Sequence, residues 1–213
     1  SGSSSVKNDR GHTRRWLQKD FSSYPKLDPL WSHFAKVNTS SSFFRIATEF
    51  FLQPAIDKIY SGLLPRLSQL PIKHRSLNSQ LDKASILTDF QFVANLPGCD
   101  SHTSRTPHLD NPQQLYALLY YMRDEFDTSI GGGLQLYKPK QSAFSAAHQR
   151  GRSIDEDHLQ ATYTLHYAAN TAIFFLNTRS SYHAVQPIYN QKLPRRSINI
   201  IGELPPGSSL FST

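Results

Sequence analysis

The feature that most constrains how this chain can fold is a change near residue 85 from a helical to a strand-like sequence pattern. After that point, short segments rich in β-branched and aromatic residues alternate with Gly, Pro and Asn turn signals. The predicted strands are 86–93, 115–122, 134–137, 161–167, 171–176, 184–188 and 197–201. A succession of this kind predicts an antiparallel barrel or jelly roll.

The first third of the chain has a helical pattern instead. Pro29 opens a short amphipathic piece, and Ser41 and Ser42 can cap a helix that begins at Phe43 and runs to Leu52 with apolar residues at helical spacing. Pro54 is expected to start the next helix. We therefore predict an α+β, mainly β fold, in which a double-stranded β-helix (jelly roll) is backed by N-terminal helices.

The helical and strand-like sequence patterns predict the domain organisation. Residues 1–10 are expected to be a tag remnant or flexible tail, and 11–213 a single domain. Within it, 11–80 would supply the supporting helices and 85–204 the jelly-roll core. Residues 139–159 are polar and are expected to form a long surface insertion.

Composition narrows the class of protein. The formal charge of +7 favours an anionic partner, but the basic residues come in pairs and triplets without a run of five, so we expect a solvated basic surface and no nucleic-acid partner. The single cysteine, Cys99, excludes an intramolecular disulfide and a cysteine-rich zinc site. No apolar run approaches the length of a membrane span, and a cytoplasmic location is expected. The oligomeric state stays open.

Three polar stretches within the strand-rich region carry chemistry. Alternate residues of a strand share a face, so His108 and Asp110 can reach one metal ion, and His183 begins another predicted strand. Two histidines and a carboxylate are the ligands of the facial triad that holds non-haem Fe(II). Arg195 and Ser197 share a face of the last strand, and a buried arginine there needs an anionic partner such as a carboxylate.

The order of these stretches resembles a known family. The blocks HLDNP, LLYYM, GGGLQLY, TAIFFLNTRSSYHAVQPI and RRSINIIGE occur in the order found in the Fe(II)/2-oxoglutarate-dependent dioxygenase superfamily, and most resemble its prolyl-4-hydroxylase-like branch. They cover about residues 85–204, more than half of the chain. An HxD tripeptide alone would be weak evidence, whereas five ordered blocks make a strong signal.

The resemblance assigns roles to individual residues. It implies that His108, Asp110 and His183 are the iron ligands. It also implies that Arg195 binds the distal carboxylate of 2-oxoglutarate, assisted by the hydroxyls of Ser197 and Tyr121. The spacing from His183 to Arg195 is a little long, so Arg196 is an alternative anchor, although strand alternation favours Arg195. The pocket mouth is expected to include Asn177, Tyr182 and, at its rim, His102.

The resemblance also implies a reaction. Fe(II) would be the metal and 2-oxoglutarate the cosubstrate, with ascorbate as a stimulating reductant. The enzyme would hydroxylate an unactivated C–H bond of a proline-like peptidyl or free amino acid, or of another small molecule, and release succinate and CO₂. Two alternatives remain at this point: a non-catalytic metal-binding jelly roll that acts as a sensor, and an oxygenase that modifies nucleic acid.

Overall fold

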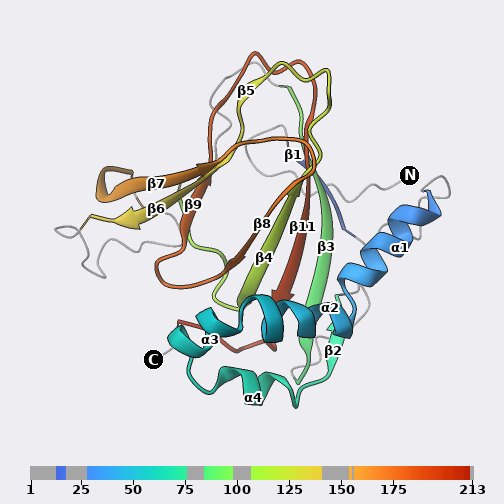
Figure 1. Ribbon diagram of the computed structural model, residues 1–213, viewed down its shortest axis with the longest axis vertical. Helices are drawn as coiled ribbons and strands as arrows, with labels where there is room; N and C mark the ends of the chain where they lie inside the picture. The colour runs from blue at the N-terminus through green and yellow to red at the C-terminus, as the bar shows by residue number, and fades with distance from the viewer. Residues whose placement is uncertain are drawn as a thin grey trace.

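The computed structural model describes residues 13–17 (backbone only), 28–75, 84–97, 107–140, 154 and 156–211. Its main sheet has the strand order β1-β3-β11-β4-β8, with β2 beside β3 (Figure 1). All of its pairings are antiparallel except the one between β2 and β3. The strands are β1 (Thr13–Leu17), β2 (Ile72–His74), β3 (Ile86–Asn95), β4 (Gln114–Tyr121), β8 (Thr171–Leu176) and β11 (Arg195–Glu203).

A second sheet has the order β7-β6-β9. It contains β6 (Leu134–Pro139), β7 (Leu159–Leu165) and β9 (Tyr182–Val185), and a β-bridge between His108 and His183 adds one more segment at β9. A short ladder joins β5 (Ile130–Gly131) to β10 (Ile188–Tyr189). Strands far apart in sequence thus become neighbours in two sheets, and the predicted mainly β jelly-roll architecture is confirmed.

Helices cover the outer face of the main sheet (Figure 1). They are α1 (Pro29–Asn38), α2 (Ser41–Arg45), α3 (Gln53–Ile59) and α4 (Leu63–Leu67), together with a π-helix at Ile46–Phe51. A 3₁₀ turn at Glu156–His158 lies elsewhere, directly before β7 of the second sheet. The Asp28 carboxylate accepts from Leu30 N–H at the start of α1, and the Ser40 hydroxyl accepts from Phe43 N–H at the start of α2. The expectation that Ser41 and Ser42 cap a helix was therefore wrong: Ser40 is the cap, and both serines lie inside the first turn.

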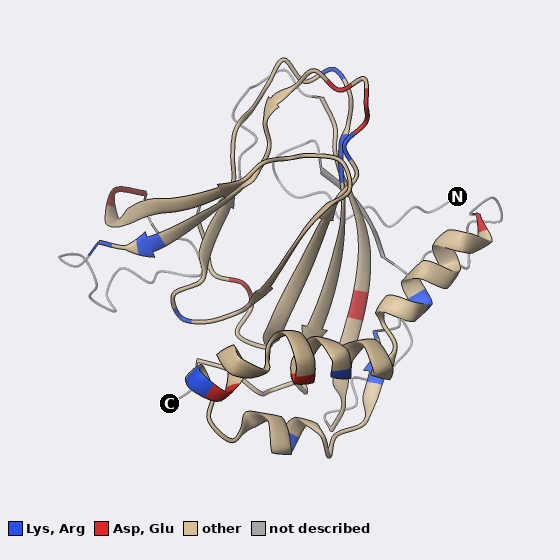
Figure 2. Cartoon of the chain, in the orientation of Figure 1, with Lys and Arg blue, Asp and Glu red and all other residues tan. Residues whose placement is uncertain are grey.

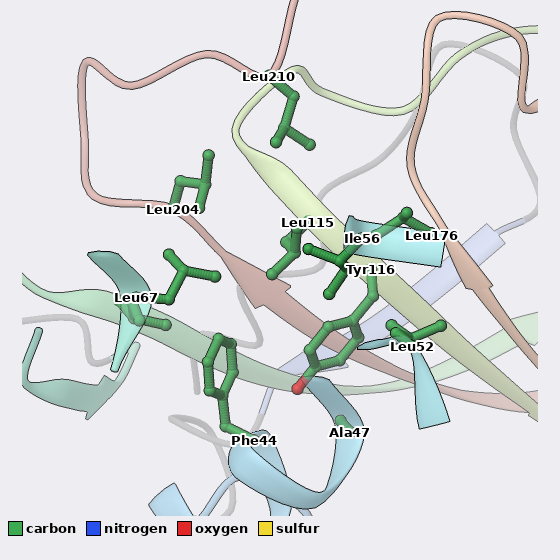
Figure 3. Packing of buried hydrophobic residues seen from close by; sticks show 11 residues of the cluster. Phe44, Ala47, Leu52, Ile56, Leu67, Leu115, Tyr116, Leu176, Leu204 and Leu210 are labelled. Carbon is green, nitrogen blue, oxygen red and sulfur yellow. The ribbon is translucent and has the colours of Figure 1, made fainter. Parts of the chain in front are cut away.

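The helices and the sheet share one apolar core around Tyr116 (Figure 3). Tyr116 on β4 is fully buried, and its ring packs against Phe44 of α2 and, edge to face, against Phe174 of β8. Residues from α3 and from the chain after β11 complete this cluster, including Ile56, Leu204 and Leu210. Burial of such side chains from both layers is what fixes the helices on the sheet.

Some elements differ from the sequence-based expectation. The predicted helix over 43–52 changes to π-helical hydrogen bonding at Ile46, and the strands β1 and β2 were not anticipated. Of the predicted insertion at 139–159, residues 141–153 and 155 lie outside the described part of the chain, and so does the predicted tail at 1–10. The domain limits remain a prediction.

Charged side chains are scattered over the structure. Figure 2 shows basic and acidic positions interspersed along the helices and the loop tips. Some of them are paired with each other, as in the ion pairs Arg45–Glu49 and Arg196–Asp124. In the described part of the chain, no helix is both long and apolar enough to cross a membrane.

Replacing Gly202 tests the packing between β11 and the core. A Cβ at this position would lie 2.4 Å from Cε1 of Tyr116, far inside van der Waals contact. We expect Gly202→Ala to lower the free energy of unfolding by about 2–3 kcal/mol, because a well-packed ring must move. Urea unfolding followed by circular dichroism measures this as a lower midpoint with an unchanged slope.

The matched control is the same substitution in a Tyr116→Leu background. There the clashing ring atoms are gone, so Gly202→Ala should cost much less than in the parent protein. Equal costs in the two backgrounds would contradict this packing account.

Candidate metal and anion site

The inner face of the main sheet, which faces away from the helices, carries a continuous set of side chains. Strand alternation and register place Ser197 directly opposite Val93 of β3 and Tyr121 of β4, and Tyr121 in turn opposite Thr171 of β8. Four residues after Thr171, Phe175 of β8 lies on the same face, and its ring centroid lies 5.0 Å from that of His183 in the second sheet. Phe175 thus connects this face to His183, one of three potential metal ligands.

His108, Asp110 and His183 form a group whose ligand atoms all lie within 4.8 Å of one another. Nε2 of His108 is 3.9 Å from Oδ1 of Asp110, and Nε2 of His183 is 3.7 Å from Oδ2 of Asp110. Both imidazoles are buried. Two imidazole nitrogens and one carboxylate that converge in a buried place are a donor set suited to a divalent transition metal, Fe(II) among them.

The backbone holds the two histidines side by side. His108 and His183 exchange N–H···O=C hydrogen bonds of 3.1 Å in both directions, and their rings lie 4.5 Å apart. Nδ1 of His183 is 2.9 Å from the carbonyl oxygen of Ser181. Because a carbonyl only accepts, this nitrogen carries the proton, and the lone pair of Nε2 points toward Asp110.

Gln114 plays the same orienting part for the carboxylate. Its Nε2 donates to Oδ2 of Asp110 at 2.9 Å. Gln114 is the first residue of β4, and its side chain is buried. The bond fixes the rotation of the Asp110 carboxylate and leaves Oδ1 as the oxygen without this contact.

Asn177 ties together the two segments that carry the cluster. Its Nδ2 donates to the carbonyls of Asn111 and Gln114 at 2.9 Å each, and its Oδ1 accepts from the hydroxyl of Ser181 at 3.3 Å. Asn177 is fully buried. It therefore connects the chain after Asp110 with the turn that leads into β9. From the sequence, Asn177 was expected at the pocket mouth, whereas its side chain lies inside the protein.

Tyr182 also lies elsewhere than expected. It precedes His183 on β9, so its side chain points to the opposite face of that strand. There it is buried in an apolar cluster with Leu109, Ile154 and Leu159. The expectation that Tyr182 lines the pocket was wrong for this reason, and the third such residue, His102, lies outside the described residues.

Arg195 is buried on the inner face, at the start of β11. Its Nε donates to the carbonyl of Gly132 at 2.7 Å, and its Nη1 donates to Oδ1 of Asn95 at 3.1 Å. Arg195 is only 3% exposed, and its Nη2 is buried with no hydrogen-bond partner among the described residues. A buried cation with one open donor edge is expected to take an anion.

Arg196, by contrast, points the other way. It is exposed, and its Nη1 lies 3.4 Å from Oδ2 of Asp124. Neighbouring residues on a strand face opposite sides, so only one of the two arginines can face inward, and that one is Arg195.

The phenol of Tyr121 lies beside this guanidinium. The centre of the Arg195 guanidinium is 5.0 Å from the ring centroid, and the hydroxyl of Tyr121 is fully buried with no hydrogen bond of normal geometry to a described residue. Burial raises the pKa of Tyr121, against smaller lowering effects of Arg195 and of the Leu134 N–H. The phenol therefore keeps its proton at neutral pH and can donate to an anion, as the buried hydroxyl of Ser197 opposite it can.

Comparison with known families gives this arrangement a context. The sequence model of the 2OG-Fe(II) oxygenase superfamily matches residues 92–201, about half of the chain. The chain belongs to this superfamily. Its members use Fe(II) and 2-oxoglutarate, so the recognition of the family and of its cofactors from sequence is confirmed.

Two solved structures of prolyl hydroxylases are similar to this chain. One, from Trichoplax adhaerens in complex with a hypoxia inducible factor oxygen degradation domain peptide fragment, is 18% identical over 54% of this chain, with a TM-score of 0.36. The other, a Pseudomonas putida prolyl-4-hydroxylase, is 14% identical over 90% of this chain and 72% of its own, with a TM-score of 0.40. This chain spans 42% of the Trichoplax enzyme's length. No curated protein matches the sequence significantly.

The structure adds supporting residues that the sequence had not singled out, and it gives Asn177 a different role from the expected one. Gln114 and Asn177 orient the metal-ligand candidates, and Asn95, Gly132 and Tyr167 surround Arg195. In the sequence, the glycine run served as a turn signal and as part of the GGGLQLY block, without a role beside Arg195. Gly132 has a φ of +72°, which favours glycine, and a Cβ there would also lie 3.3 Å from Cδ of Arg195.

Removing the Asn177 amide tests its structural role. Asn177→Leu removes the amide donor that joins the carbonyls of Asn111 and Gln114, although the Asn111 carbonyl keeps its bond from the Gln114 N–H, so we expect the free energy of unfolding to fall by about 2 kcal/mol. Urea denaturation measures the change. Asn38→Ala is the control, because it also deletes a side-chain bond to a carbonyl, that of Phe34, but at the exposed end of α1. An equal, small effect of both variants would rule out the connecting role of Asn177.

Proposed function

We propose that this chain is an Fe(II)- and 2-oxoglutarate-dependent hydroxylase in which His108, Asp110 and His183 hold the metal. The observation that carries the proposal is the pairing of two features on facing sheets. One is the converging His-Asp-His cluster, and the other is the buried Arg195 with an open donor edge. A metal site alone would be compatible with many functions, and the buried cation adds a place for the anionic cosubstrate.

The second part of the proposal concerns that cosubstrate. Nη2 of Arg195 and the hydroxyls of Tyr121 and Ser197 would bind the distal carboxylate of 2-oxoglutarate, while its other end reaches the metal. Charge-assisted hydrogen bonds in a buried place are the strong ones, so this anchor supplies affinity and orientation. When bound, Fe(II) would activate dioxygen, the oxidant, which gives one oxygen atom to succinate as 2-oxoglutarate loses CO₂ and the other to the alcohol formed from a substrate C–H bond.

The protein residues around the metal act on orientation. The Ser181 carbonyl accepts from Nδ1 of His183, so that in the neutral imidazole Nε2 is the nitrogen with the lone pair, and Gln114 keeps the Asp110 carboxylate from rotating. Phe175, packed on the His183 ring, places apolar surface next to the cluster and limits the access of water.

For the substrate, we propose a peptidyl or free amino acid of the proline type. This rests on the five sequence blocks that most resemble the prolyl-4-hydroxylase-like branch. A screen of succinate formation with Fe(II) and 2-oxoglutarate across peptides, amino acids and other small molecules tests it. Turnover with none of the proline-containing compounds, but with another class, would sink the substrate assignment and leave the chemistry intact.

The metal site can be tested without turnover. His108→Ala and Asp110→Asn remove ligands, and we expect both to abolish specific binding of Mn(II), used as a redox-stable substitute for Fe(II), in anaerobic calorimetry. Gln114→Leu should weaken Mn(II) binding by about 10–100-fold, because the carboxylate loses its orienting bond. His158→Ala, which changes a histidine in the 3₁₀ turn outside the cluster, is the control and should bind as the parent does. Unchanged binding in His108→Ala would refute the assignment.

The anion site has a matched pair of variants. Arg195→Ala should raise the KM for 2-oxoglutarate roughly 100-fold, because it removes a buried charge-assisted contact worth about 2–3 kcal/mol. Arg196→Ala, next to it on the exposed face, should change it less than about threefold. Steady-state kinetics and direct 2-oxoglutarate binding in the presence of Mn(II) both measure this. The opposite ranking would make Arg196 the anchor.

A further inference from the structure

A stack of four side chains surrounds the proposed anion site. The guanidinium of Arg195 lies 5.0 Å from the ring centroid of Tyr121 and 5.2 Å from that of Tyr167, and the two rings meet edge to face at 5.2 Å. The guanidinium of Arg123 lies 5.4 Å from the Tyr167 ring centroid. Tyr167 is thus in contact with two cations, and the anchor Arg195 is in contact with two aromatic faces.

Tyr167 is held at both ends. Its hydroxyl accepts from the backbone N–H of Arg196 at 2.9 Å, and its carbonyl accepts from Nη1 of Arg123 at 2.8 Å. The ring is buried. The first bond locks the phenol to the start of β11, and the second locks the backbone to Arg123.

Arg123 also fixes the loop that contacts the anchor from another side. Its Nη2 donates to the carbonyls of Asp127 and Ser129 at 3.0 and 2.6 Å. This segment continues through β5 to Gly132, whose carbonyl accepts from Nε of Arg195. Arg123 therefore supports Arg195 by two routes, through the Tyr167 ring and through the Gly132 carbonyl.

We infer that Tyr167, supported by Arg123, is a positioning residue that sets the length of the 2-oxo dicarboxylic acid the enzyme accepts. This rests on the proposed role of Arg195 as the cosubstrate anchor. An arginine side chain is long and flexible, and in an open pocket it would retreat to admit a longer diacid. Here two aromatic faces, the Gly132 carbonyl and the Asn95 amide oxygen leave the guanidinium one place to lie.

The consequence is a fixed distance between the open Nη2 and the metal-ligand cluster. We expect this distance to suit a five-carbon diacid such as 2-oxoglutarate, whereas 2-oxoadipate, longer by one methylene, would have to bend to fit. One methylene in a confined site is worth about tenfold or more in discrimination. Loosening the guanidinium should remove this discrimination in addition to weakening binding.

The test compares the affinities of the two acids. The dissociation constants of 2-oxoglutarate and 2-oxoadipate are measured anaerobically with Mn(II) bound, so that no turnover is needed. The parent enzyme should prefer 2-oxoglutarate by about tenfold or more. Tyr167→Leu should weaken 2-oxoglutarate binding by about tenfold and bring the preference within about threefold of equality.

Two variants serve as controls, and a third repeats the test at another residue. Tyr167→Phe keeps the ring and should retain the preference. Tyr163→Leu removes a tyrosine from the exposed side of β7 and should behave as the parent. Arg123→Gln, at a partly exposed position, should shift the preference in the same direction as Tyr167→Leu, and it provides the answer if Tyr167→Leu does not fold.

The outcomes separate this inference from the function it rests on. If Arg195→Ala retains full 2-oxoglutarate affinity, the anchor assignment fails. If Arg195→Ala loses affinity while Tyr167→Leu and Arg123→Gln keep the parent's preference, or weaken both acids equally, the positioning role is overturned. A parent enzyme with no preference between the two acids overturns it as well.

Discussion

The pairing of β11 between β3 and β4 is the interaction on which the rest of the structure depends. Its register places Ser197 between Val93 and Tyr121, and Ile198 between Phe92 and Tyr120. Even-numbered residues of β11 consequently pack toward the helices, while Arg195 and Ser197 face inward. A slip of one residue would exchange these faces, turning Ile198 and Ile200 inward and placing Ser197 and Asn199 in the apolar layer, so the hydrophobic pattern enforces the register that the chemistry needs.

The second sheet depends on a smaller set of bonds with the same logic. Its ligand candidates come from two segments about 70 residues apart, and the mutual backbone hydrogen bonds of His108 and His183 bring them into contact. The Asn177 amide and the Gln114 side chain then limit how these segments can rotate. A preorganised donor set is obtained because Gln114, Asn177 and the Ser181 carbonyl give buried polar groups in this region protein partners.

The candidate metal ligands could be predicted from the sequence because each belongs to a motif of a few neighbouring residues. The HLD tripeptide, the isolated His183 and the alternation around Arg195 can each be recognised in a few residues, and their order along the chain agrees with one superfamily. The choice between Arg195 and Arg196 was favoured by strand alternation, and the register of β11 supports it. Asn177 and Tyr182 were misjudged, because residues near a ligand in sequence can lie inside the core when the strand or turn directs them there.

The sequence by itself determined the fold class, the family and the residue types of the site, because strand periodicity, turn residues and ordered motifs are written along the chain. Only the tertiary structure decided which side chains support those residues. Gln114 lies on Asp110, Asn177 joins two ligand segments, and Tyr167 lies between Arg123 and Arg195. These contacts link different strands and loops, so no local pattern encodes them: they exist only where two sheets and a long loop are packed to within a few ångströms.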